Sequence, residues 1–233
     1  MRIAIISDIH SNIEALTRTF EIIDQKNIDT IVCIGDIVGY GANPNECVDL
    51  IRARAHHTLR GNHDEASTSL ARIENYTFLA QTVVRWTKTV LTDDNRKFLQ
   101  ALPFTKELET LFFTHASPYE PAEWHYILSA HDAEMNFEYF TEDICFIGHT
   151  HRPVIFSTDG TTVHIERNKR YIVNVGSVGQ PRDSDERLSF GIFDTKLWAY
   201  ENIRADYDFR TAAQKIIDAG LPRALADRLS IGR

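Results

Sequence analysis

The chain has 233 residues, of which 43% are hydrophobic and 25% charged, and this composition is typical of a globular protein with a substantial core. Its formal net charge is −8 at neutral pH, and no cluster of Lys and Arg is present. This balance argues against a long nucleic acid held by its backbone as the main partner. A small phosphorylated substrate, including a nucleotide, remains compatible because bound cations can reverse the sign of an acidic surface.

Cysteine usage and the lack of long apolar segments favour a reducing compartment. Cys33, Cys47 and Cys145 show no CxxC spacing, and two of them lie inside apolar runs, where a thiol behaves as a small hydrophobe. Asp8 and His10 interrupt the first apolar stretch, which is unlike a signal peptide. No window approaches the ~18 apolar residues that a membrane helix needs. We therefore expect a cytoplasmic protein without a membrane segment, and the oligomeric state stays open.

Five short apolar runs, bounded by Gly or turn residues, predict buried β-strands at residues 3–7, 31–35, 57–61, 111–114 and 144–148. Each run leads into side chains that can bind a metal, namely Asp8 and His10, Asp36, Asn62, His115, and His149 and His151. Ligands of open α/β sheets gather at the carboxyl ends of the strands, so we expect these side chains at one edge of one sheet. The pattern predicts a metal site there.

Helical patterns separate the first strands. Ser11 and Glu14 form a potential capping box, which predicts a helix directly after His10. Asn43 and Pro44 suit the start of a second helix that runs to about residue 53. Strands that alternate with helices in this way predict right-handed βαβ units.

Residues 66–107 interrupt that alternation. Their pattern predicts two helices, at 74–92 and 94–102, which either cap the site or pack against the flank of the sheet. We favour packing with some contribution to the rim. The loop at 116–130 is rich in Pro and aromatic residues, and because it leaves directly from His115 we expect it to line the mouth of the site.

After His151 the pattern changes to short strands without helices, at 154–157, 162–166, 171–175, 189–194 and 197–204. We expect these strands to form an antiparallel second sheet packed against the first. Residues 208–233 read as helical, with a stop at Gly220. The predicted fold class is an α/β protein, an α+β sandwich of two packed mixed sheets flanked by helices, in a single domain over residues 1–233.

The donor types select the metals. Asp8-x-His10 and His149-x-His151 place two ligands two residues apart, so that both can project in the same direction. Carboxylate oxygen combined with imidazole nitrogen suits Mn, Fe, Zn or Ni rather than Ca. Seven candidates are too many for one ion, so two divalent ions that share a carboxylate account for the set.

The ordered series Asp8-x-His10, Gly35-Asp36, Gly61-Asn62-His63-Asp64, His115 and Gly148-His149-x-His151 resembles the calcineurin-like metallophosphoesterase superfamily over residues 1–200, and most closely its small bacterial branch of phosphodiesterases and diadenosine-tetraphosphatase-like proteins. The resemblance implies a binuclear site. Asp8, His10 and His151 would hold one metal, and Asn62, His115 and His149 the other, with Asp36 bridging.

The resemblance also implies a mechanism. A metal-bound hydroxide would attack phosphorus in line, without a phosphoenzyme. His63 would act as the general acid, a role typically worth about 10²–10⁴ in rate. Asp64 would either orient His63 or cap the next helix.

One departure from the superfamily concerns substrate binding. Some members carry an Arg in the glycine-rich segment after the bridging Asp, where this chain has Tyr40. The missing clamp weakens the case for a phosphomonoester dianion. Arg60 and Arg182 are the remaining candidates for phosphate contact. Tyr40 and His125 are further candidate substrate contacts, although each could also be a packing or surface residue.

The sequence therefore predicts a metal-dependent phosphoester hydrolase, most consistent with a phosphodiesterase or a nucleotide-polyphosphate hydrolase. The alternative enzyme is a phosphomonoesterase, including a protein phosphatase. The alternative outside catalysis is a scaffold, because one retromer subunit resembles this fold, lacks the catalytic His and binds proteins. The complete ligand set and His63 argue against the scaffold.

Overall fold

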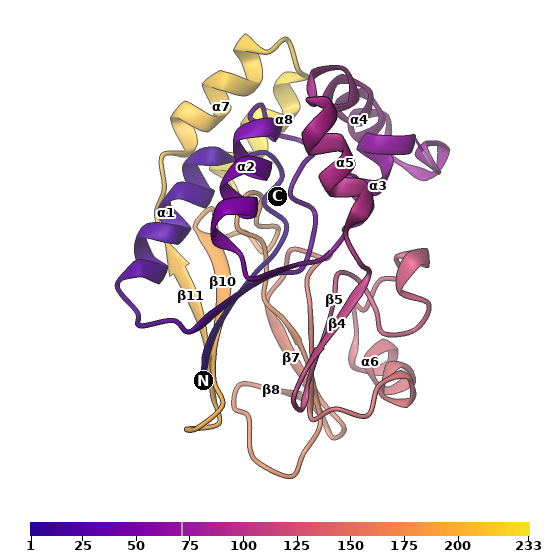
Figure 1. Cartoon of the computed structure of the whole chain (residues 1–233), viewed down its shortest axis with the longest axis vertical. Coiled ribbons are helices and arrows are strands. Elements are labelled where there is room, and N and C mark those ends of the chain that lie inside the picture. The colour runs from indigo at the N-terminus through magenta and orange to yellow at the C-terminus, as the bar shows by residue number, and fades with distance from the viewer. Residues whose placement is uncertain (71) are drawn as a thin grey trace.

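Two mixed β-sheets pack face to face in this computed structural model, which describes residues 1–70 and 72–233 (Figure 1). The first sheet has the order β11-β10-β1-β2-β3. Its strands are β1 (Arg2–Ile6), β2 (Thr30–Cys33), β3 (His57–Thr58), β10 (Leu188–Asp194) and β11 (Ala199–Ala205). The second has the order β4-β5-β6-β9-β7-β8. Its strands are β4 (Thr105–Leu108), β5 (Leu111–Thr114), β6 (Ile144–Ile147), β7 (Val154–Ser157), β8 (Gly160–Thr162) and β9 (Tyr171–Asn174). The predicted sandwich of two mixed sheets is confirmed.

The core lies in layers on both faces of the first sheet. Along β1, Ile3 and Ile5 point between the sheets, where they pack with Phe113 and Phe146 of the second sheet. Ala4 belongs to the cluster on the opposite face, beneath the first two helices. Successive side chains of a strand point to opposite faces, so a strand that is apolar at every position is covered on both sides.

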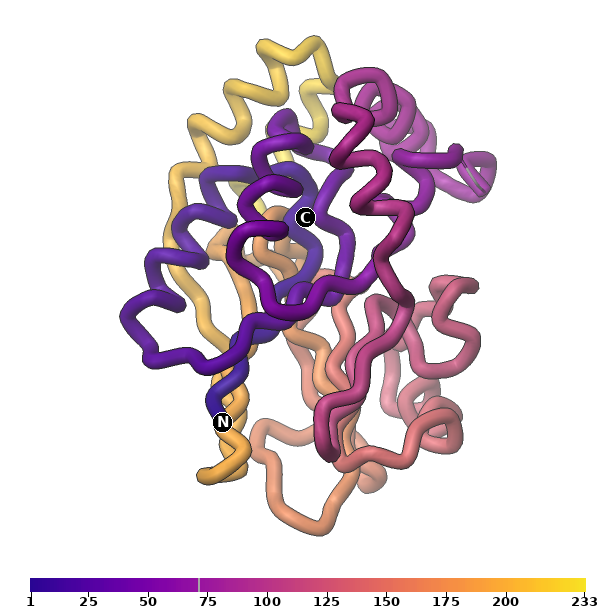
Figure 2. Tube along the Cα trace, viewed as in Figure 1, coloured from indigo at the N-terminus to yellow at the C-terminus, as the bar shows by residue number. Residues whose placement is uncertain are grey.

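Eight α-helices surround the sheets in the described residues, and the first three of them come directly after β1, β2 and β3 in the chain. They are α1 (Ile13–Asp24), α2 (Pro44–Arg54), α3 (Asn62–Ser69), α4 (Phe78–Val90), α5 (Asp93–Ala101), α6 (Ala130–Asn136), α7 (Phe209–Asp218) and α8 (Arg223–Asp227). Short 3₁₀ helices are η1 (Ile73–Asn75), η2 (Pro121–Glu123), η3 (Phe137–Tyr139) and η4 (Arg228–Ser230). Helices α4, α7 and α8 lie at one end of the molecule and the β7–β8 hairpin at the other (Figure 2). Within the described residues, none of these helices has the length and apolarity to cross a membrane.

Two expectations about the sheets were wrong. The strands that lead to the metal-binding side chains do not share one sheet, because β1, β2 and β3 belong to the first sheet and β5 and β6 to the second. The strands after His151 do not form a separate antiparallel sheet either. Strands β10 and β11 extend the first sheet through an antiparallel pairing of β10 with β1, and β9 pairs in parallel with β6. Turn signals predict hairpins, but they do not tell which sheet a later strand joins.

Local boundaries also differ from the pattern. Asn12, not Ser11, caps α1, since its side chain accepts a hydrogen bond from the backbone N–H of Ala15 at 3.1 Å. The helix expected at 74–92 is divided into η1 and α4, because Thr77 caps α4. The strand expected at 162–166 is wrong apart from its first residue, because β8 spans Gly160–Thr162 and ends there. Residue 71 of the 66–107 segment lies outside the described residues.

Candidate metal centre

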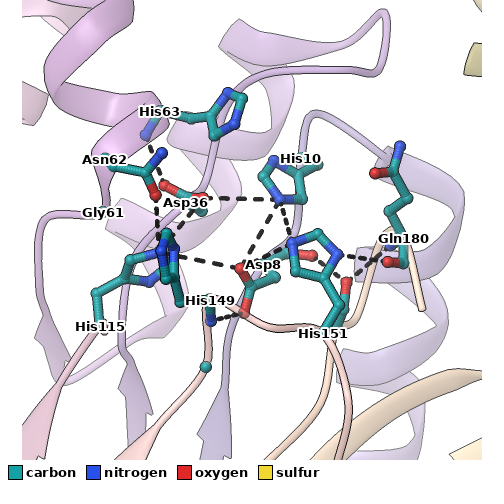
Figure 3. A network of polar contacts seen from close by, with 12 residues as sticks. Asp8, His10, Asp36, Gly61, Asn62, His63, His115, His149, His151 and Gln180 are labelled. Atoms are coloured by element: carbon teal, nitrogen blue, oxygen red, sulfur yellow. Dashed lines mark hydrogen bonds and ion pairs between the residues drawn. The ribbon is translucent and has the colours of Figure 1, made fainter. Parts of the chain in front are cut away.

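The seven predicted ligands meet where strands of both sheets end (Figure 3). Asp8 and His10 follow β1, Asp36 follows β2, and Asn62 begins α3 directly after β3. The other three follow β5 and β6 of the second sheet: His115, His149 and His151. Two groups that share no residue could each hold an ion, since their donor atoms lie within 4.8 Å of one another: Asp8, His10 and His151, and Asp36, His115 and His149. A third such group, His10, Asp36 and His63, overlaps both of them. The site therefore bridges the open ends of the two sheets.

The two carboxylates lie between these groups. Oδ1 of Asp8 lies 3.2 Å from Nε2 of His151, and Oδ2 of Asp36 lies 3.3 Å from Nε2 of His115. Nε2 of His10 is 3.7 Å from both carboxylates. Asp36 thus faces both groups of donors, and so does Asp8, whose Oδ1 also lies 4.0 Å from Nε2 of His115.

Backbone carbonyls orient three of the imidazoles. Nδ1 of His10 lies 3.1 Å from the Val38 carbonyl oxygen, and Nδ1 of His115 lies 3.0 Å from that of Ile34. His151 has the same arrangement with the carbonyl of Gln180, at 2.5 Å (Figure 3). A carbonyl oxygen can only accept, so each Nδ1 carries a proton, and each Nε2 presents a lone pair when its ring is neutral. This second layer is typical of metal-binding histidines.

Unpaired polar atoms at the centre fit a cation. Nε2 of His10 and Nε2 of His151 lie 3.0 Å apart. In both rings Nδ1 donates its proton to a carbonyl oxygen, so the two Nε2 lone pairs point toward each other. Oδ1 of Asp8 and both ring nitrogens of His149 are buried without a hydrogen-bond partner. Such groups are costly to bury unless something positive lies between them. The donors present therefore suit divalent metal ions, of the classes that take both carboxylate and imidazole.

In the metal-free protein, a proton on His115 neutralises part of the negative charge of Asp8 and Asp36. Burial lowers the pKa of His115, but Asp36 and Asp8 raise it more strongly, to about 9. Burial alone would raise the pKa of Asp8, yet His151 and His115 hold it well below its usual range. A metal ion would replace the proton, and metal binding here should therefore release protons.

The backbone of the ligands is strained. Five of them have positive φ: Asp8 at 53°, His10 at 50°, Asp36 at 53°, His149 at 64° and His151 at 62°. Non-glycine residues rarely adopt this left-handed conformation, and each instance costs on the order of 1–3 kcal/mol. Strain of this kind persists where the surrounding structure over-determines it, and functional sites are where it gathers.

Gly61 shows why a glycine precedes the metal-binding Asn62. A Cβ at this position would lie 2.1 Å from Oδ1 of Asp36 and 2.2 Å from its backbone nitrogen. Only glycine permits this approach. The start of α3 can therefore contact Asp36, whose Oδ1 accepts a hydrogen bond from the backbone N–H of His63 at 2.8 Å.

His63 and Asp64 have separate surroundings. The imidazole of His63 lies among the rings of Tyr40, His10 and Tyr76, with centroid distances of 4.6, 5.0 and 5.2 Å. The carboxylate of Asp64 accepts hydrogen bonds from the backbone N–H groups of Ile37 and Val38 and from that of Gly61, which caps α3. Asp64 therefore caps α3, which is one of its two predicted roles, and it also binds the backbone of the loop after β2. Burial and the nearby Asp36 raise the pKa of Asp64 to about 7.

A cleft of about 490 Å³ opens beside the cluster. Its lining includes His63 and His149 together with four large aromatic residues: Tyr40, Tyr76, Trp124 and Tyr126. The ring of Tyr126 stacks on His149 with centroids 4.1 Å apart. The hydroxyl of Tyr76 accepts a hydrogen bond from Nδ2 of Asn62 at 2.8 Å and so turns its amide oxygen toward His115.

Sequence reasoning did not single out Tyr76 or give Tyr126 a role. Tyr126 lies on the loop that was expected to line the mouth, which was the only available signal. Tyr76 has no motif, and it reaches the site because η1 and α4 pack beside α3.

The structure separates the predicted substrate contacts. Tyr40 and Arg182 line the cleft, whereas Arg60 and His125 are not among its described lining residues. The guanidinium of Arg60 lies 4.9 Å from the centroid of the Phe104 ring and donates to the carbonyl of Gln100. His125 stacks on an exposed tyrosine, and its Nε2 lies 3.4 Å from a carboxylate of Glu120. The contacts of His125 correspond to its alternative as a surface residue, and those of Arg60 are packing contacts away from the cleft lining.

Comparison with known families agrees with the geometry. A model of the calcineurin-like phosphoesterase superfamily domain matches residues 1–197. The chain belongs to this superfamily. The two-sheet fold with helices on its faces is the fold of a metallophosphoesterase.

Three similar proteins illustrate the membership. Protein MJ0912 of Methanocaldococcus jannaschii is 39% identical over 99% of this chain and 98% of its own length. A metallophosphoesterase from Sphaerobacter thermophilus has a TM-score of 0.90 at 35% identity, covering 100% of this chain and 99% of its own. Protein PH1004 of Pyrococcus horikoshii has a TM-score of 0.86 at 18% identity, covering 100% and 98%, and shares the fold.

Proposed function

We propose that this superfamily member is a dimetal phosphodiesterase or nucleotide-polyphosphate hydrolase. The observation that carries the proposal is that two groups of metal donors lie next to each other at the edge of an aromatic cleft, with Oδ2 of Asp36 in the second group 3.7 Å from Nε2 of His10 in the first. Two bound cations would polarise the phosphoryl oxygens and acidify a water molecule. We propose Asp8, His10 and His151 for one cation and Asn62, His115 and His149 for the other.

We propose that His63 serves the leaving group. Burial lowers its pKa to about 4, so the imidazole is neutral at neutral pH in the free protein. The negative charge of a bound phosphate would raise this pKa, and a protonated His63 could then donate to the leaving oxygen. Its donor atoms also lie within 4.8 Å of those of His10 and Asp36, so the role as acid has to be separated from a role as ligand.

The cleft supports a substrate that carries an aromatic group. The exposed face of Tyr126 and the rings of Tyr76 and Trp124 border the space next to His149. Stacking of a base on an aromatic side chain is worth ~1–3 kcal/mol and tolerates different bases. Tyr40 replaces the phosphate-clamping Arg of some superfamily members, which favours a diester or an anhydride over a monoester dianion.

The test is a metal titration with paired substrates. Metal-free protein would receive Mn²⁺ while hydrolysis of bis(p-nitrophenyl) phosphate and of p-nitrophenyl phosphate is recorded, with Asp36→Asn as control. Diester turnover that appears with about two equivalents of metal supports the proposal. Monoester turnover alone would shift the assignment to a phosphatase. Bound metal without turnover of either ester, or of a panel of nucleotides, would favour the scaffold.

A further inference from the structure

The C-terminal tail brings a second arginine against Tyr40, which is a lining residue of the cleft, although this arginine is not itself among the described lining residues. Cζ of Arg228, at the start of η4, lies 5.9 Å from the centroid of the Tyr40 ring. Cζ of Arg182 lies 5.4 Å from the same centroid. The family model ends at residue 197, so Arg228 comes from a part of the chain beyond it. Two arginines from separate segments therefore lie against the Tyr40 ring, and the centroid of this ring lies 4.6 Å from that of His63.

Neither arginine has an acidic partner among the described residues. Nη2 of Arg182 donates to Oε1 of Gln180 at 2.8 Å, and Nη1 of Arg228 approaches the same oxygen at 3.5 Å. Nε of Arg182 is buried without a hydrogen-bond partner. In contrast, Arg72 and Arg204 each pair with a carboxylate. One neutral amide oxygen does not balance two guanidinium groups, so the pair retains positive charge and unused N–H donors.

Packing holds the two like charges together. Leu221, Leu225 and Leu229 of the tail belong to one apolar cluster with Tyr40 and with residues of α4 and α7. On its other side, the tail carbonyl of Gly232 accepts a hydrogen bond at 2.9 Å from the backbone of residue 184, close to Arg182. Figure 1 shows α7 and α8 (yellow) at the same end of the molecule as α4. The tail is thus fixed both to the Tyr40 ring and to the loop of Arg182.

We infer that Arg182, Tyr40 and Arg228 form a subsite for a second phosphate group of the substrate. The inference rests on the proposed function, because it places the first phosphate at the metal cluster. It narrows the substrate class to phosphoanhydrides and diesters that bear a further phosphate, such as nucleoside polyphosphates. Guanidinium groups match phosphate oxygens in a bidentate geometry, and the Tyr40 ring serves as the platform that aligns them.

Calorimetry with inorganic anions tests the subsite without requiring turnover. Protein loaded with Mn²⁺, with free Mn²⁺ in excess, would be titrated with phosphate and with tripolyphosphate. Tripolyphosphate carries the further phosphate groups that the subsite would bind, whereas phosphate carries none. We expect Arg228→Ala and Arg182→Ala to weaken tripolyphosphate binding about tenfold or more and to leave phosphate binding within about twofold. Arg223→Ala, an exposed arginine on α8, is the matched control.

If the variants lose affinity equally for both anions, or lose no affinity for tripolyphosphate, the subsite is overturned. If Arg228→Ala lowers the melting temperature, Arg228→Gln replaces it, because Gln keeps most of the aliphatic part of the side chain and removes the guanidinium group. The affinity of this variant for tripolyphosphate then tests the subsite. If bis(p-nitrophenyl) phosphate is hydrolysed, tripolyphosphate should inhibit competitively, and non-competitive inhibition would instead indicate a separate regulatory site. A protein that hydrolyses no ester but still discriminates the anions through Arg228 would refute the proposed function and leave the anion subsite standing.

Discussion

The metal cluster and the wall of the cleft are built in different ways. Each candidate ligand follows a strand closely, and hydrogen bonds to backbone carbonyls fix the side chains of His10, His115 and His151. The wall instead combines Tyr76 from the segment before α4, Tyr126 from the loop after β5, and Arg182 from the loop after β9. The chemistry of the cluster is thus encoded locally, whereas the shape of the cleft depends on the packing of distant segments. Substitutions in the two regions should change different quantities.

The largest effect should come from Asp36→Asn, inside the cluster. Losing the charge that faces both donor groups removes several kcal/mol of metal binding, so we expect activity to fall by about 10³-fold or more and metal content to fall with it. Metal analysis of the purified variant beside its rate checks this. A variant that keeps two ions and full activity would contradict the bridging role of Asp36.

His63→Ala sits at the boundary between the two regions. It should keep the metal and lose about 10²-fold in kcat on a substrate with a poor leaving group, because only proton donation is removed. Metal content and turnover measured on the same sample separate the alternatives. Loss of metal would make His63 a ligand, and unchanged kcat would remove it from the mechanism.

Tyr76→Phe tests how the wall supports the cluster. The variant loses the hydroxyl that accepts from Nδ2 of Asn62 and donates to its carbonyl. Second-layer changes of this kind typically cost about 10–100-fold in metal affinity, and we expect the lower end. Competition with a chelator measures it. Tyr139→Phe, at an exposed tyrosine outside the cleft, is the control and should change nothing.

Arg60→Ala should have the smallest effect on activity. Its guanidinium lies over Phe104, so we expect kcat/KM within about twofold and a loss of ~0.5–1 kcal/mol in the free energy of unfolding. Steady-state kinetics and urea denaturation give both values. A tenfold rise in KM with unchanged stability would restore Arg60 as a substrate contact.

The part of the site that could be predicted from sequence is the part that is local. The runs before Asp8, Asp36 and His115 are short, apolar and bounded by turns, and they form strands with the metal donors at their ends. The assignment of those strands to two sheets could not be read from the runs themselves, because pairing is a contact between distant segments. Tyr76 and Arg228 were missed for the same reason, since neither belongs to a motif.

The positive φ angles of the ligands have a consequence for how these positions tolerate mutation. Asn, Asp and His, besides Gly, are the residues that most readily adopt the left-handed conformation, and Asp and His are also metal donors. Backbone and metal therefore select overlapping residue types at Asp8, Asp36 and His149. In a saturation library scored only for folding of the metal-free protein, Asn and Gly should outlast Val and Ile at these sites. The left-handed backbone conformation would thus limit which residue types these positions accept, even in a protein that binds no metal.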